Sequence, residues 1–104
     1  MEHLSQSEWI EGAKQAYSVI LDVRTQEEWD KGYILGAQLN DIYTGQAFIY
    51  RLEDFDKSKN YYVYCHAGGR SAKACQIMEQ LGFPNTYNLI GGISEWEGPL
   101  ENDN

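Results

Sequence analysis

The feature that most constrains the fold is the segment 61–64, Tyr-Tyr-Val-Tyr, which is apolar or aromatic at every position. A strand of this composition needs cover on both faces, as in the middle of a parallel sheet flanked by helices. Cys65 follows at once, then a loop containing Gly68 and Gly69, then a helical pattern from Ser71 to Leu81. This order predicts an open α/β sheet with a ligand crevice at the carboxyl end of the strand.

The rest of the chain alternates short apolar runs with helical patterns, which predicts a parallel sheet with flanking helices. Two capping boxes, Ser5-x-x-Glu8 and Thr25-x-x-Glu28, mark helix starts. We expect further strands at 19–23, 37–40 and 86–89, and helices at 5–17, 25–31, 46–52 and, as a single turn, 94–97.

Length and charge restrict the classes of function that are open to the chain. Its 104 residues suffice for one domain, 1–104, with a motif-bearing core at about 19–98. The net charge of −8 repels phosphate backbones, so we expect no nucleic-acid partner. No run approaches the roughly 18 apolar residues that span a bilayer, and the polar, acidic start is unlike a signal peptide. We therefore expect a soluble, cytoplasmic monomer.

Two cysteines are present, Cys65 and Cys75, and in a reducing compartment both are free thiols. They are ten residues apart and only His3 and His66 supply imidazoles, so we expect no metal site. Cys75 falls in the middle of the predicted helix beside core-facing positions, and we interpret it as structural.

The loop after residue 64 has the composition of an anion cradle around Cys65. Gly68 and Gly69 allow the backbone N–H groups to point inward, and the following helix adds the positive end of its dipole. Such surroundings favour a thiolate, so the pKa of Cys65 should be depressed. Arg70 can grip an oxyanion with its planar fork of donors. Lys73, expected in the first helical turn, opposes the dipole and so points to function.

Three blocks of the sequence, in a fixed order, carry a family resemblance. The segment 65–71, Cys-His-Ala-Gly-Gly-Arg-Ser, resembles the active-site loop of single-domain rhodaneses. Asp22-Val23-Arg24 with Glu28 and the segment 32–37 resembles the first block of the family, which usually has histidine where this chain has Tyr33. Gly91-Gly92-Ile93 with Trp96 resembles the closing block.

The resemblance implies an α/β, rhodanese-like fold: a five-stranded parallel sheet flanked by helices on both faces. It also implies that a sulfane sulfur is moved from a donor such as thiosulfate to cyanide or a thiol through a Cys65 persulfide. No metal or organic cofactor is implied. The expected substrate-binding residues are His66, Ala67, Gly68, Gly69, Arg70, Ser71 and Lys73, with Asp22 and Arg24 in structural support.

Several roles stay open from the residues alone. His66 can tune the charge of the nucleophile, contact substrate or simply fill the loop. Asp22 and Arg24 are best interpreted as an ion pair or hydrogen-bond network beside the loop. The acidic residues of the second helix are most simply a solvated face; these are Glu27, Glu28 and Asp30.

The rival enzyme is a rhodanese-related cysteine phosphatase, which also uses a thiolate in a backbone cradle that ends in arginine. Four residues separate Cys65 from Arg70 here, whereas the phosphatase pattern has five and a wider cradle. Sulfur transfer is therefore favoured. A persulfide carrier that serves one protein partner, or an interaction module on the same fold, remains an alternative.

Overall fold

The computed structural model describes residues 1–103 and contains the predicted parallel sheet. Its five strands are parallel throughout and follow the order β1-β6-β5-β2-β4. Their bounds are β1 Glu2–Leu4, β2 Ser18–Asp22, β4 Gln38–Leu39, β5 Asn60–Tyr64 and β6 Thr86–Leu89. A separate antiparallel pair joins β3 (Tyr33–Ile34) to β7 (Leu100–Glu101).

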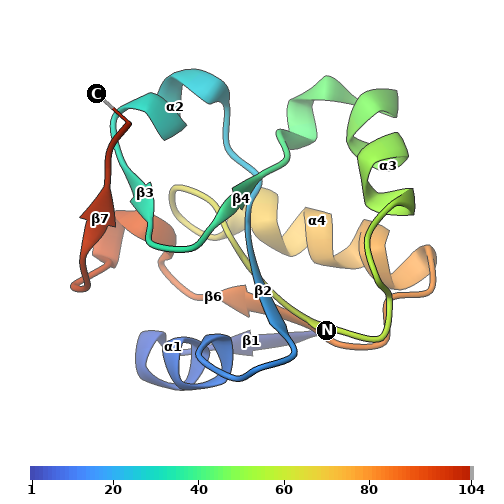
Figure 1. The fold of residues 1–104 in the computed structure, drawn as a ribbon, viewed down its shortest axis with the longest axis horizontal. Coiled ribbons are helices and arrows are strands. Elements are labelled where there is room, and N and C mark those ends of the chain that lie inside the picture. Colours follow the sequence, from blue (N-terminus) through green and yellow to red (C-terminus); the bar gives the residue numbers. More distant parts are fainter. Residues whose placement is uncertain (104) are drawn as a thin grey trace.

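Helices cover both faces of this sheet (Figure 1). The α-helices are α1 Gln6–Ala13, α2 Gln26–Asp30, α3 Gln46–Glu53 and α4 Gly69–Gln80, and the 3-10 turns are η1 Ile42–Thr44 and η2 Gly92–Glu95. Helix α1 lies on one face, and α3 and α4 lie on the other (Figure 1). No helix within residues 1–103 combines the length and apolar character needed to cross a membrane.

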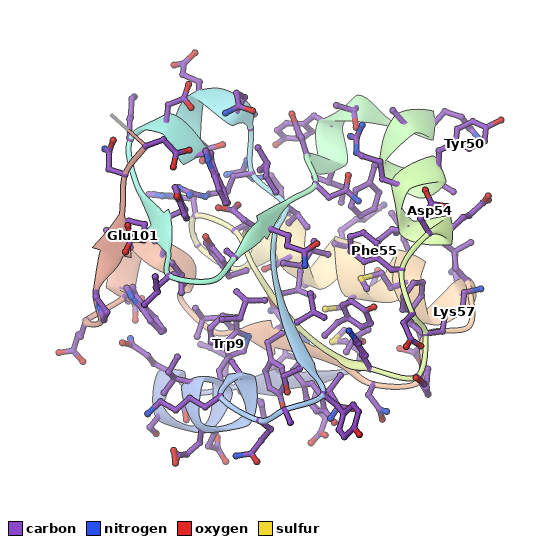
Figure 2. The ribbon with its side chains drawn as sticks, viewed as in Figure 1. Trp9, Tyr50, Asp54, Phe55, Lys57 and Glu101 are labelled. Atoms are coloured by element: carbon purple, nitrogen blue, oxygen red, sulfur yellow. The ribbon has the colours of Figure 1, made fainter. Side chains whose placement is uncertain are left out.

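Alternation along β5 divides the interior into two cores. Tyr61 and Val63 point toward α3 and α4, where they join Leu52 and Met78 among others. Tyr62 and Tyr64 point to the other face and pack with Trp9 of α1. Figure 2 shows Trp9 between α1 and the sheet, and its ring meets both tyrosine rings edge-on, with centroids 5.9 and 6.0 Å apart. The strand is thus covered on both faces, as its composition predicted.

Both capping boxes are formed, with Ser5 and Thr25 as the N-cap residues. Three predicted boundaries are wrong. Helix α1 ends at Ala13 instead of continuing to about Tyr17, because a turn there leads into β2. Helix α4 begins two residues earlier than predicted, at Gly69, and the last helical turn is also two residues earlier, at Gly92–Glu95.

The fifth strand, β1, was not predicted from the residues themselves. Glu2, His3 and Leu4 show no apolar run, and they form a strand because they pair with Tyr87, Asn88 and Leu89 of β6. As a sheet edge with one neighbour, β1 tolerates exposed polar side chains, so its sequence carries a weak signal.

Candidate active site

Cys65 lies at the carboxyl end of the central strand β5, directly before the amino end of α4. Between them the chain turns back on itself at Gly68, whose φ of 108° is rarely adopted by other residues. The side chain of Cys65 is buried, with 1% of its surface exposed. The strand, the turn and the helix together hold the sulfur at the base of a short loop.

Backbone and hydroxyl donors surround the sulfur. The Gly68 N–H donates to Cys65 Sγ at 3.1 Å, and the Ser71 hydroxyl lies 3.4 Å from the same atom. Burial by itself raises the pKa of the Cys65 thiol, but hydrogen bonds from the Ser71 side chain and from the backbone of Ser71, Gly68 and Ala67 outweigh it. The net pKa is lowered, as the glycine loop predicted.

Backbone hydrogen bonds from η2 also hold the loop. The Ile93 N–H donates to the Cys65 carbonyl and the Ser94 N–H donates to the His66 carbonyl, each at 2.9 Å. A Cβ at Gly92 would lie 2.6 Å from the Cys65 carbonyl oxygen and 2.4 Å from that of His66. Only glycine at position 92 therefore permits this approach.

Arg70 is held by an acidic residue from α2. Its Nη1 and Nη2 donate to the two carboxylate oxygens of Glu28 at 2.7 and 2.9 Å. The pair lowers the pKa of Glu28 to about 2, chiefly through the hydrogen bond from Arg70. The guanidinium carbon also lies 5.4 Å from the centre of the Tyr43 ring. The interpretation of Glu28 as a solvated residue is therefore wrong, since it fixes the guanidinium beside the loop.

The predicted network of Asp22 and Arg24 is confirmed. Asp22 is fully buried and accepts hydrogen bonds from Arg24 Nε and Nη2 and, at 2.6 Å, from the Tyr64 hydroxyl. Arg24 Nη2 also donates to the Gly32 carbonyl, and the Ile34 N–H donates to the Tyr64 oxygen. The network ties β2, β5 and the segment around β3 together beside the loop.

The side chains of the other predicted site residues lie around the loop. His66 and Ala67 are exposed. Because α4 begins at Gly69, Lys73 lies in the second turn and not the first, so the argument from an opposed dipole is wrong for it. Hollows of about 470 and 460 Å³ lie on the two sides of Arg70; the first is lined in part by His66, the second in part by Lys73.

Cys75 lies in the core beneath the helix and not in the loop. It lies on the buried face of α4 among the core residues, with no exposed surface. Burial raises its pKa to about 12, so it is protonated at neutral pH. Within residues 1–103 no three His, Cys, Asp or Glu side chains form a group that could hold a metal ion.

Comparison with known proteins identifies the architecture. A family model described as "Rhodanese-like domain" matches residues 5–99. The chain belongs to the rhodanese-like domain family. A solved rhodanese-like domain protein from Staphylococcus aureus shares 34% sequence identity with a TM-score of 0.85, and all of each chain is covered. The five-stranded parallel sheet with helices on both faces is the fold of this family.

Two curated relatives of this rhodanese-like chain are from Bacillus subtilis (strain 168). The putative sulfurtransferase YtwF is 34% identical over 100 residues, which cover 93% of this chain and 88% of YtwF. The putative sulfur carrier protein YrkF is 34% identical over 82 residues, which cover 79% of this chain but 43% of YrkF. The family and these relatives support a transferase that handles sulfur.

Two polar residues near the sulfur were missed from the sequence. Asn88 lies in β6, is 3% exposed, and accepts a hydrogen bond from the Ser71 hydroxyl. His3 of β1 contacts the Asn88 amide through Nδ1 at 3.0 Å. A polar residue in the middle of the predicted strand at 86–89 was the available signal for Asn88, whereas His3 had none.

Proposed function

We propose that this rhodanese-like domain is a sulfurtransferase that accepts a sulfane sulfur from thiosulfate on Cys65 and passes it to cyanide or to a thiol. The observation that carries the proposal is the cradle around Cys65 Sγ, where a backbone N–H and a hydroxyl lower the pKa of the thiol. Such donors stabilise the thiolate before the reaction and an anionic sulfur after it.

The proposed reaction has two displacements at sulfur. The Cys65 thiolate attacks the outer sulfur of thiosulfate, the S–S bond of the donor breaks, and sulfite leaves with the electron pair. The product is a Cys65 persulfide. Its terminal sulfur is anionic and accepts hydrogen bonds from the N–H groups of the loop. Cyanide or a thiolate then attacks that terminal sulfur, and Cys65 leaves as a thiolate. No further oxidant or reductant is needed.

Substrate binding is assigned to the loop and its rim. The backbone of residues 66–71 would hold the terminal sulfur and the donor oxygens, and Arg70 and Lys73 supply the positive charge around it. Arg70 can bind the donor oxygens while it is paired with Glu28, because the pair uses two of the five guanidinium N–H groups. Asp22 and Arg24 have a structural role: their hydrogen bonds hold together the strands beside the loop.

A carrier that gives its sulfur to one protein thiol is the second candidate. The name of YrkF, a putative sulfur carrier protein, supports it. We also propose that the chain acts in the cytoplasm as a monomer; the two free thiols and the donation to the sulfur from within one chain support this. The phosphatase reading is not favoured, since only four residues separate Cys65 from Arg70.

Thiosulfate:cyanide transfer, measured as thiocyanate produced, tests the proposal. The wild-type chain and Cys75→Ser should turn over, while Cys65→Ser should be inactive although folded. If cyanide is not an acceptor but glutathione or a reduced protein thiol is, the carrier reading is favoured. Absence of transfer to every acceptor, from several sulfane donors, would contradict the sulfurtransferase assignment.

A further inference from the structure

A chain of hydrogen bonds runs from the outer strand β1 to the sulfur of Cys65. His3 Nδ1 lies 3.0 Å from Asn88 Nδ2, and that nitrogen also donates to the Gly68 carbonyl at 3.2 Å. On its other side the Asn88 amide oxygen accepts from the Ser71 hydroxyl, which in turn lies 3.4 Å from Cys65 Sγ. Three elements, β1, β6 and α4, are therefore linked to the nucleophile.

Counting donors and acceptors fixes the direction of this chain. The Gly68 carbonyl can only accept, so the side-chain nitrogen of Asn88 must face it, and the amide oxygen must then face Ser71. His3 accepts the second proton of the same nitrogen when Nδ1 is unprotonated. The orientation of Asn88 is thus set from both sides.

Ser71 has one hydroxyl proton and two acceptors for it, the Asn88 amide oxygen and Cys65 Sγ. While Cys65 is a thiol, the hydroxyl can donate to Asn88 and accept a hydrogen bond from the S–H group. A thiolate is stabilised further by the opposite arrangement, in which the Ser71 hydroxyl donates to the sulfur and its hydrogen bond to Asn88 is lost.

We propose that Asn88, oriented by His3, is a positioning residue for Cys65 that competes with the thiolate for the Ser71 hydroxyl proton. The competition keeps the thiol from ionising as fully as the cradle alone would allow. A moderately acidic thiol is useful, because intrinsic nucleophilicity falls as thiol pKa falls. Arg70 is paired with Glu28, and the N–H groups that donate to the sulfur belong to the backbone, so the Ser71 hydroxyl is the donor that can rotate to another partner.

The test is the pH dependence of Cys65 alkylation by iodoacetamide, measured in a cycle of Asn88→Ala, Ser71→Ala and the double variant. Trypsin cleaves after Lys59 and Arg70, so peptide 60–70 reports Cys65 apart from Cys75. Asn88→Ala should lower the apparent pKa of Cys65 by about half a unit, roughly a threefold gain in the thiolate-to-thiol ratio. Ser71→Ala should raise that pKa.

The double variant separates the proposal from a purely structural role. If Asn88 acts through the hydroxyl, its effect on the pKa of Cys65 should vanish when Ser71 is alanine. An equal effect in both backgrounds would mean that Asn88 acts by holding the Gly68 carbonyl, and would overturn the proposal. So would a rise in the pKa for Asn88→Ala alone. Asn85→Ala, just before the same strand at its opposite end, is the matched control and should leave the pKa unchanged.

Asn88→Asp keeps the size of the side chain but turns an oxygen toward the Gly68 carbonyl in place of the donating nitrogen, so its folding is checked by urea unfolding before the titration. Its carboxylate is a stronger acceptor with a negative charge, so the pKa of Cys65 should rise by about one unit or more. An unchanged pKa in Asn88→Asp would contradict the proposal. The inference deepens the proposed sulfur transfer, yet the assay measures thiol ionisation alone, so failure of either is recognised separately.

Discussion

Replacing Gly92 with alanine should dislodge the loop that carries the nucleophile. The added Cβ would lie 2.4 Å from the His66 carbonyl oxygen and 2.6 Å from that of Cys65, both backbone atoms that a side-chain rotation cannot move. Relief of the clash requires η2 to move away, which stretches the two hydrogen bonds from Ile93 and Ser94 that hold these carbonyls.

The cost follows from two contributions. The φ of Gly92 is +58°, where a residue with a Cβ costs roughly 1–2 kcal/mol. Each backbone hydrogen bond lost contributes about 1 kcal/mol. We therefore expect Gly92→Ala to reduce the free energy of unfolding by about 3–4 kcal/mol, and to reduce the alkylation rate of Cys65 as well, since the sulfur leaves its donors.

Gly36→Ala is the matched control. Gly36 also has a positive φ, +87°, but a Cβ there would meet no atom within 4 Å. It should lose only the conformational contribution of about 1–2 kcal/mol and retain full Cys65 reactivity. Urea unfolding followed by tryptophan fluorescence measures both variants. Equal losses of stability, with an unchanged alkylation rate in Gly92→Ala, would refute the role assigned to this close approach.

Further predictions concern residues around the loop. Cys75→Ser should retain most sulfur transfer and lose about 1–3 kcal/mol of stability, because a hydroxyl replaces a buried thiol; loss of transfer with persulfide intact would instead make Cys75 a resolving thiol. Arg70→Lys should reduce transfer about tenfold or more, because lysine cannot span both oxygens of Glu28. Lys73→Ala should cost less than about threefold, and only at low salt. The pKa of Glu28 is depressed from 4.5 to about 2, so its stabilisation is present above pH 4.5 and lost as the pH falls toward 2; Glu28→Gln should flatten that part of the urea-unfolding profile. Hydrolysis of aryl phosphates should be negligible. Robust hydrolysis that disappears in Cys65→Ser would instead support the phosphatase hypothesis.

The central part of the fold could be predicted because its signals are local. The segment 61–64 needs cover on both faces, and the two capping boxes mark helix starts through contacts only three residues apart. The cradle was predictable for the same reason, since Cys65, Gly68 and Ser71 are close in the sequence and the turn brings them together.

Contacts between distant segments could not be predicted in the same way. The pairing of Glu28 with Arg70 joins residues 42 positions apart, and the contact of His3 with Asn88 spans 85. A carboxylate on an exposed helix looks the same in sequence whether or not an arginine lies opposite it. Strand β1 depends entirely on its pairing with β6, so neither the strand nor the role of His3 had a local signature.

The most direct test of the account is to locate the sulfur after reaction with thiosulfate. The protein is treated with thiosulfate, trapped with iodoacetamide and digested with trypsin, and the masses of the peptides containing Cys65 and Cys75 are compared. The account predicts one added sulfur atom on peptide 60–70, removed by cyanide before trapping and absent in Cys65→Ser. No added sulfur with any sulfane donor, or sulfur on Cys75 instead, would contradict the claim that Cys65 in its cradle is the sulfur-carrying nucleophile.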